Sequence, residues 1–294
     1  MFEGSYVALV TPFSGGKIAF GDVERLLDFH ISSGTDGILL CGTTGEGATL
    51  TREEYRELIA FVKKSLNGKL PIIAGIGSND TRVAIENAAT CERLGIDGLL
   101  AITCYYNKPT QAGLIAHFTK IATSTRLPII IYNIPGRTSV NLLPESFSQL
   151  CDVPNIVAVK EASGDMKQVL KIRRLCGERL TILSGEDLMV VPIMSVGGKG
   201  VISASANVLA EPMASMCRLY SEGKVDEAAE IQVRISPVVQ AFFMETNPGP
   251  IKTALAEMGL CSGELRLPLV EMLPGNKEKL LAVMRDYGLL GQRH

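Results

Sequence analysis

Lys160 occupies a position at which a lysine side chain can do chemistry. It follows the apolar run 156–159, which is typical of a buried strand, and a polar segment begins at Glu161. A charged amine at the rim of an apolar strand is unfavourable unless it is paired, neutralised or used. Burial there can bring a lysine pKa of about 10.4 toward about 7–8, at a cost on the order of 4 kcal/mol. The neutral amine can then form a Schiff base with a carbonyl, and the competing interpretation is an ion pair with Glu161 or another acid.

Hydroxyl groups are the available proton carriers for such a reaction. Thr43, Tyr106 and Tyr132 each follow an apolar run. Schiff-base chemistry passes through carbinolamine, imine and enamine, so protons must move at each step. A tyrosine at a strand end is otherwise a half-buried packing residue with a satisfied hydroxyl. Beside a Schiff-base lysine we favour the relay, because the histidines at 30, 117 and 294 fall on expected helices or at the terminus.

The loop 42–47 reads Gly-Thr-Thr-Gly-Glu-Gly. Its glycines allow tight turns, and exposed backbone N–H groups in such a loop can hold a carboxylate. It is not a P-loop, because the lysine expected after the second glycine is absent. Taken alone, it is equally consistent with an ordinary glycine-rich loop. A second glycine cluster, at 197–200, precedes the last expected strand and is therefore interpreted as structural.

Arg137 follows a loop that proline and glycine make rigid. Asn133-Ile134-Pro135-Gly136 stands directly before it. A fixed guanidinium is suited to a substrate carboxylate. Taken by itself, the residue is better interpreted as a solvated surface arginine, so a functional role depends on its neighbours in space.

The elements that must position these residues are strands and helices in alternation. Helical patterns fill the gaps between the strands, one of them with Asp22 as its expected cap and one opening with a capping box of Thr51 and Glu54. This order predicts an α/β fold, a (β/α)8 TIM barrel over 1–207, with a doubly wound open sheet as the weaker alternative. We expect a C-terminal helical extension over 208–294, packed on the barrel as one structural unit. Eight short apolar runs are the expected strands: 6–11, 37–41, 71–75, 98–103, 128–132, 156–160, 180–184 and 200–204. The expected extension helices are 212–222, 225–246, 250–258 and 277–287.

Composition narrows the class of protein. The chain of 294 residues is 46% hydrophobic, its net charge is −2, and no basic run points to nucleic acid. Seven cysteines form no Cys-x-x-Cys pair, which fits a reducing compartment. Neither a signal peptide nor an apolar stretch near the roughly 20 residues of a membrane span is present. The expectation is a cytoplasmic protein that binds neither nucleic acid nor membrane.

Several long motifs in a fixed order resemble the pyruvate-dependent class I aldolase family of N-acetylneuraminate lyase and dihydrodipicolinate synthase. The resemblance spans essentially the whole chain. Within the family, the double threonine and the Pro-Gly-Arg-Thr segment favour the dihydrodipicolinate synthase branch. The motifs are Gly42-Thr43-Thr44-Gly45-Glu46, Tyr105-Tyr106-Asn107-Lys108-Pro109, Tyr132-Asn133-Ile134-Pro135-Gly136-Arg137-Thr138, Val159-Lys160-Glu161-Ala162-Ser163-Gly164 and Asn247-Pro248.

The resemblance implies a lyase reaction between pyruvate and L-aspartate 4-semialdehyde, in lysine and diaminopimelate synthesis. Lys160 forms the Schiff base with pyruvate, and the amides of Thr43 and Thr44 hold the pyruvate carboxylate. Tyr132 donates and accepts protons, linked through the Thr43 hydroxyl to Tyr106. No organic cofactor or metal is implied.

The resemblance also implies how the second substrate and the assembly complete the site. Arg137 binds the carboxylate of the semialdehyde, and Gly185 and Ile202 line the pocket. Tyr106 comes from a neighbouring subunit, which makes a homodimer part of the active site, and the family often forms a homotetramer as a dimer of dimers.

A site for feedback inhibition by lysine is the part that departs from the family. Asn79 and Tyr105 match the allosteric site of lysine-sensitive members. Arg52, Tyr55 and Val83 stand where a sensitive pattern has two histidines and a glutamate. Losing the glutamate removes a partner for the effector ammonium, and Arg52 adds like charge, so we expect weak or absent inhibition.

Two other functions were weighed. One is a pyruvate aldolase acting on a sugar acid or a hydroxy-oxoglutarate, which would not need Arg137. The other is a non-catalytic barrel that binds a keto acid, and the combination of Lys160, Tyr132, Thr43 and Tyr106 argues against it.

Overall fold

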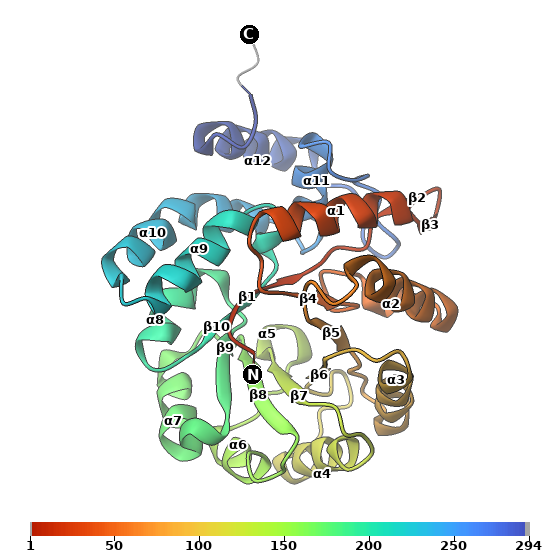
Figure 1. Cartoon of the computed structure of the whole chain (residues 1–294), viewed down its shortest axis with the longest axis vertical. Coiled ribbons are helices and arrows are strands. Elements are labelled where there is room, and N and C mark those ends of the chain that lie inside the picture. Colours follow the sequence, from red (N-terminus) through yellow and green to blue (C-terminus); the bar gives the residue numbers. More distant parts are fainter. Residues whose placement is uncertain (1, 292–294) are drawn as a thin grey trace.

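The apolar runs form the eight parallel strands of a closed barrel, and the predicted (β/α)8 fold is confirmed (Figure 1). The computed structural model describes residues 2–291; Met1 and residues 292–294, including the predicted terminal histidine His294, lie outside the described residues. The strands follow one another around the barrel in chain order and close by pairing of the last with the first. They are β1 Gly4–Ala8, β4 Gly37–Leu40, β5 Ile72–Gly75, β6 Gly98–Ile102, β7 Ile129–Asn133, β8 Ile156–Glu161, β9 Thr181–Ser184 and β10 Gly200–Ser203.

Alternation along the strands divides the buried apolar side chains into two clusters. The larger cluster fills the space between the sheet and the surrounding helices. The smaller one fills the barrel interior and includes Phe2, Tyr6, Ile73 and Tyr132. Neighbouring strand residues point to opposite faces, so a strand that is buried on both faces reads as a continuous apolar run. This is why the strands carry no polar alternation in the sequence.

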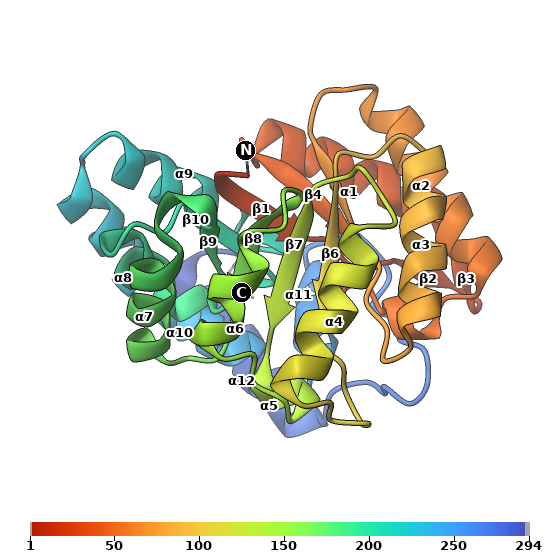
Figure 2. The same cartoon turned by 90° about the horizontal axis from the view of Figure 1, so that it is seen from below.

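The helices lie outside the barrel (Figures 1 and 2). The capping box of Thr51 and Glu54 is confirmed, and Asp80 caps the helix that follows β5. The expectation that Asp22 caps the first helix is wrong: the helix begins two residues earlier, and Asp22 instead pairs with Arg25 in its first turn. The barrel helices are α1 Phe20–Ser32, α2 Arg52–Leu66, α3 Thr81–Arg93, α4 Gln111–Ala122, α5 Pro135–Thr138, α6 Pro144–Leu150, α7 Met166–Cys176 and α8 Val190–Ser195. Short 3₁₀ turns are η1 Gly47–Thr49, η2 Gly177–Arg179, η3 Asp187–Met189 and η4 Ser205–Asn207.

Four helices follow the last barrel strand. The first of them packs against β1; because α5 is only a single turn, this helix completes the ring of eight barrel helices, and the following helices lie beside α1 and α8 (Figure 1). The predicted helix 225–246 ends earlier, at Phe242. The division of the chain after residue 207 stays a prediction. The four helices are α9 Ala210–Ser221, α10 Val225–Phe242, α11 Gly249–Glu257 and α12 Pro274–Tyr287.

A hairpin of two short strands, β2 Phe13–Ser14 and β3 Lys17–Ile18, joins the barrel to the irregular segment between α11 and α12. The Glu264 carboxylate accepts hydrogen bonds from Gly15 N at 2.8 Å and Gly16 N at 2.7 Å. The hairpin was not predicted, because strands of two residues are too short to show a period. It fastens the C-terminal segment to the N-terminal end of the chain.

Within residues 2–291, none of the helices has both the length and the apolarity that crossing a membrane requires. All seven cysteines are buried and free.

Candidate active site

A cavity of about 170 Å³ opens at the carboxyl ends of the barrel strands. Tyr132 and Lys160 stand opposite each other in neighbouring strands, and both side chains line the cavity. The register of β7 and β8 therefore places the predicted nucleophile and proton carrier at one level of the barrel. The remaining lining residues are Ala8, Leu39, Gly42, Thr43, Thr44, Leu100, Ile134, Arg137, Ala162, Gly185, Glu186, Ala204, Phe243 and Asn247.

Lys160 is buried, with 6% of its surface exposed, and its Nζ lies 4.4 Å from the centre of the Tyr132 ring. Burial lowers its pKa from 10.5 to about 8; the charge of Asp187 opposes this shift and the charge of Arg137 adds to it. This lies at the edge of the range that the strand-end position led us to expect. A lysine with that pKa has roughly a tenth of its amine in the neutral, nucleophilic form at pH 7, far more than an ordinary lysine.

Glu161 is not the partner of Lys160. Successive strand residues point to opposite faces, and Glu161 turns away from the cavity. Its carboxylate accepts hydrogen bonds from Asn133 Nδ2 at 3.1 Å, Gln168 Nε2 at 3.1 Å and Ser163 N at 2.7 Å. In the part of the chain that the structure describes, no salt bridge involves Lys160. The ion-pair interpretation therefore has no acidic residue to pair with the lysine.

Tyr132 is buried beside the lysine, and this burial raises the pKa of its phenol well above the usual range. The charge of Arg137 and the side chain of Thr43 both act to lower it. The phenol therefore stays protonated at neutral pH and can donate a proton. Thr43 is also the neighbour through which the family resemblance implies a proton relay, and that relay stays a prediction.

The glycine-rich loop is held tightly against the barrel. Gly47 packs so close to Cys41 that a Cβ there would lie 2.2 Å from the Cys41 carbonyl oxygen. The Thr11 hydroxyl, three residues after the end of β1, donates to Gly45 O at 2.6 Å. From the C-terminal segment, Asn247 Nδ2 donates to Thr44 Oγ1 at 2.9 Å. The loop has few ways to move while these contacts persist.

Arg137 lines the cavity although the residue is exposed. It lies in α5, the single turn that begins at Pro135, and it lines the cavity. Its Nη2 donates to the carbonyl of Asn247 at 3.4 Å. A guanidinium at the mouth of a cavity that holds a lysine and a tyrosine is placed to attract an anion.

Gly185 and Ile202 occupy different layers of the barrel. Gly185 lines the cavity, and a Cβ at this position would lie 3.0 Å from Lys160 Cγ, so only glycine leaves room for the lysine stem. Ile202 is fully buried in the interior cluster with Tyr132 and does not line the cavity among the described residues. It supports the floor beneath the site.

Two predicted site residues stand apart from the cavity in this chain. Tyr106 is 88% exposed, with a left-handed backbone at φ 69°. Asn79 does not line either cavity; its carbonyl accepts a hydrogen bond from Asn107 Nδ2 at 2.9 Å. Neither residue contributes a side chain to the cavity within one chain.

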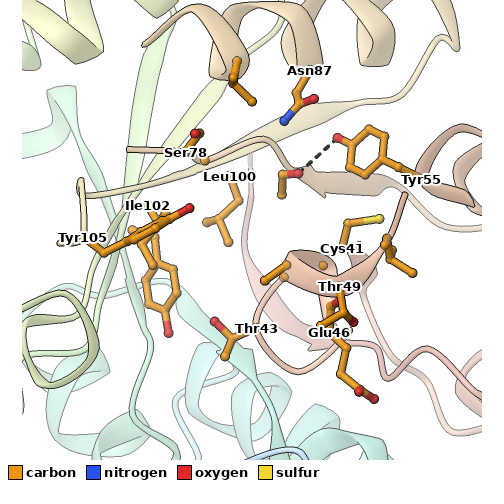
Figure 3. A pocket seen from close by; sticks show the side chains of 18 of the residues that line it. Cys41, Thr43, Glu46, Thr49, Tyr55, Ser78, Asn87, Leu100, Ile102 and Tyr105 are labelled. Atoms are coloured by element: carbon orange, nitrogen blue, oxygen red, sulfur yellow. Dashed lines mark hydrogen bonds between the residues drawn. The ribbon is translucent and has the colours of Figure 1, made fainter. Parts of the chain in front are cut away.

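A second, larger cavity of about 580 Å³ lies beside the first, between the glycine-rich loop, α2 and α3 (Figure 3). Figure 3 shows Tyr105 and Thr43 on one side of it and Tyr55, which donates to Gly75 O at 3.1 Å, on the other. Arg52 and Val83 also line it. The two cavities are adjacent, since Thr43 lines both.

Sequence reasoning gave no role to four residues at the site. Asn247 was recognised only as part of a motif, and Phe243 was expected inside a helix. Glu186 and Asp187 follow β9 and carry no motif of their own, yet both shift the pKa of Lys160. Asn247 and Phe243 reach the cavity from the C-terminal region, and no local pattern in the sequence marks that approach.

Comparison with known proteins gives full-length matches. The model of the dihydrodipicolinate synthetase family matches residues 1–286. A 4-hydroxy-tetrahydrodipicolinate synthase from Thermodesulfovibrio yellowstonii is 49% identical over 290 residues, covering 99% of this chain and 100% of the relative. The crystal structure of dihydrodipicolinate synthase from Aquifex aeolicus matches with a TM-score of 0.96 at 43% identity, covering 98% of this chain and 99% of that chain. A dihydrodipicolinate synthase from Cyanidioschyzon merolae, solved with lysine bound, matches with a TM-score of 0.95 at 40% identity, covering 98% and 99%.

Proposed function

The chain belongs to the dihydrodipicolinate synthetase family, and we propose that its site condenses pyruvate with L-aspartate 4-semialdehyde to give 4-hydroxy-tetrahydrodipicolinate. The activity is that of a lyase of lysine and diaminopimelate biosynthesis. The observation that carries this proposal is that Lys160, buried and with a lowered pKa, faces Tyr132 in a cavity that Arg137 also lines. The full-length similarity to 4-hydroxy-tetrahydrodipicolinate synthases supports the same substrates.

In the first half-reaction, Lys160 attacks the keto carbon of pyruvate and water leaves, so a protonated imine forms. The backbone amides of Thr43 and Thr44 hold the pyruvate carboxylate, in a loop that is fastened by Thr11 and Asn247. Loss of a methyl proton converts the imine to an enamine, whose carbon is the nucleophile for the second substrate.

Tyr132 serves as the proton donor and acceptor in these steps. Its burial keeps the phenol protonated when no base is nearby, so it needs a partner to take or supply the proton. The Thr43 hydroxyl provides the first link, and Tyr106 of a second copy of the chain provides the next. The exposure of Tyr106 in the single chain supports a role in trans.

Arg137 binds the carboxylate of aspartate semialdehyde at the mouth of the cavity. The aldehyde then faces the enamine carbon, and a carbon–carbon bond forms between them. Gly185 leaves space beside Lys160, and Ile202 packs beneath Tyr132. The amino group of the semialdehyde later attacks the imine carbon, which closes the ring and frees Lys160.

We assign the active form to a homo-oligomer in the cytoplasm. A dimer is the smallest assembly that supplies Tyr106 in trans, and a homotetramer built from two such dimers is the expected form. The free cysteines fit a reducing compartment.

The test is condensation of pyruvate with L-aspartate 4-semialdehyde, coupled to an NADPH-dependent reductase, beside a panel of sugar-acid and oxo-acid aldehydes. We expect a kcat/KM for the semialdehyde of about 10⁴ M⁻¹s⁻¹ or more. Turnover of another aldehyde without turnover of the semialdehyde would overturn the assignment of the second substrate.

A further inference from the structure

Glu46 ends the Gly42–Glu46 motif, and the proposed reaction gives it no task. Its side chain is 1% exposed and is paired with Lys252 of α11, which is 0% exposed. Thr43 and Glu46 both line the larger cavity (Figure 3), but of the two only Thr43 also lines the smaller cavity that holds Lys160. We propose that Lys252 is a positioning residue: through Glu46 it holds the loop whose amides bind the substrate carboxylate. The inference rests on the proposed function and deepens it.

The buried pair is fully satisfied on both sides. Lys252 Nζ donates to Glu46 Oε1 and, at 2.7 Å, to the carbonyl of Glu264, and it lies 4.3 Å from the centre of the Phe13 ring. The other carboxylate oxygen of Glu46 accepts from Arg266 N at 3.0 Å. Such a set of partners leaves the carboxylate one position, because any movement would break a bond of a buried charge.

The ion pair of Lys252 and Glu46 acts directly on the turn that presents Thr43 and Thr44. Glu46 N donates to Thr43 O at 3.0 Å, so residues 43–46 form a turn with Thr44 and Gly45 at its centre. Glu46 itself adopts a left-handed backbone with φ 50°, which a non-glycine residue takes up at a cost. The side-chain ion pair with Lys252 thus fixes the last residue of the turn in a conformation that it would not favour alone.

The segment that leads into α11 contacts the loop at a second point. Asn247, two residues before α11, donates to Thr44 Oγ1, and Lys252 lies five residues farther along the chain. The C-terminal segment therefore contacts both the middle of the turn, at Thr44, and its last residue, Glu46. Displacement of reacting groups by about 1 Å can cost on the order of 10²-fold in rate, so a loosened turn should be visible in substrate binding.

The test compares two carbonyl compounds on the Lys252→Met variant. Borohydride trapping is titrated with pyruvate and with methyl pyruvate, an ester that lacks the carboxylate. We expect the half-saturating pyruvate concentration to rise about tenfold, within the range that misplacement allows, and the methyl pyruvate value to stay at its wild-type level. Unchanged values for both compounds, or equal rises for both, would overturn the proposal, since a general structural defect does not select for the carboxylate.

Matched variants protect the interpretation. Lys277→Met removes a lysine from α12 whose pair with Glu257 lies at the surface, and it should leave both titrations unchanged. If Lys252→Met does not fold, Glu46→Gln/Lys252→Met removes both buried charges and should fold. The double variant should still raise the half-saturating concentration of pyruvate and leave that of methyl pyruvate unchanged. Wild-type values for both compounds would contradict the positioning role of Lys252. If the wild-type chain is not trapped by pyruvate, the proposed function fails; if it is trapped and the variants match it, only this inference fails.

Discussion

At the scale of single residues, the chemistry depends on how little water reaches Lys160. Desolvation is the main cause of its lowered pKa, and the acids Asp187 and Glu186 limit the shift. The neutral amine is the nucleophile, so the group that matters is the deprotonated one. Tyr132 shifts in the direction that keeps its proton. The two groups thus begin the reaction in opposite roles, the amine free to attack and the phenol ready to donate.

We expect the rate of pyruvate trapping to follow the titration of Lys160. Its pKa is lowered from 10.5 to about 8. Below about pH 8 the charged form dominates, and the rate should rise about tenfold per pH unit; above it the amine is neutral, and the rate should level off. The measurement is single-turnover borohydride trapping between pH 6 and 10. A rate that still rises steeply between pH 9 and 10 would show an ordinary, exposed lysine.

Replacement of Arg137 should separate the two substrates. Loss of a charged hydrogen bond costs about 1.5–3 kcal/mol, so Arg137→Ala should raise the KM for aspartate semialdehyde by roughly 10- to 10²-fold. The titration of pyruvate trapping should change little when it is made at pH 9, because the charge of Arg137 also lowers the pKa of Lys160. Arg82→Ala, which removes an exposed guanidinium paired with Asp80, is the control. An equal loss for both substrates would contradict the role of Arg137 in binding the semialdehyde.

At the scale of elements, the strand order and the strand ends could be predicted, and the short or distant contacts could not. Apolar runs marked all eight strands, because burial on both faces leaves no polar positions. The first was extended too far: Leu9 and Val10 are buried, but Val10 N donates to Asn207 Oδ1 instead of to a neighbouring strand. An apolar run indicates that residues are buried, but it does not indicate where their pairing with a neighbouring strand ends.

The candidate site shows the same division. Lys160 and Tyr132 could be predicted because each is the last residue but one of a recognisable strand. Glu46 and Lys252 are 206 positions apart in the sequence, so no local pattern of charge or residue spacing predicts their pairing. The roles given to individual site residues stay predictions until variants are assayed.

The elements α2 and α3 lead us to expect weak or absent inhibition by lysine. Val83 lines the larger cavity where a carboxylate would be needed for the lysine ammonium, and the nearby Glu86 is paired with Arg52 at 3.0 Å. Inhibition should therefore need more than about 1 mM lysine, a binding free energy weaker than about 4 kcal/mol. Val83→Glu should increase sensitivity, and Arg82→Glu on the exposed side is the charge control. Half-inhibition of the wild-type enzyme below that concentration would refute the expectation.

At the scale of the whole molecule, the proposed mechanism requires a residue that the cavity of one chain does not contain. Tyr106 and the apolar side chains Leu267, Val270 and Leu273 are exposed, and Pro268 and Leu269 of the same segment line the larger cavity. We therefore expect a second copy of the chain to cover these exposed side chains and to bring Tyr106 to the site.

Subunit mixing tests this arrangement. A Lys160→Ala chain and a Tyr106→Phe chain should each be nearly inactive as homo-oligomers. In a mixed dimer, the Lys160 of one chain meets the Tyr106 of the other, so one site is complete. With random exchange about one quarter of sites should recover, as measured in the coupled assay after co-refolding or co-expression. No recovery, with exchange verified by mass, would place Tyr106 in the same chain as its lysine or outside the reaction.

The central claim is that Lys160 forms an imine with pyruvate, and borohydride reduction in the presence of pyruvate tests it most directly. We predict a gain of one reduced pyruvate per chain by mass spectrometry, mapped by peptide sequencing to Lys160. Lys120→Met should gain the same mass, and Lys160→Met should gain none. A wild-type chain without added mass, or with the adduct on another lysine, would contradict the account.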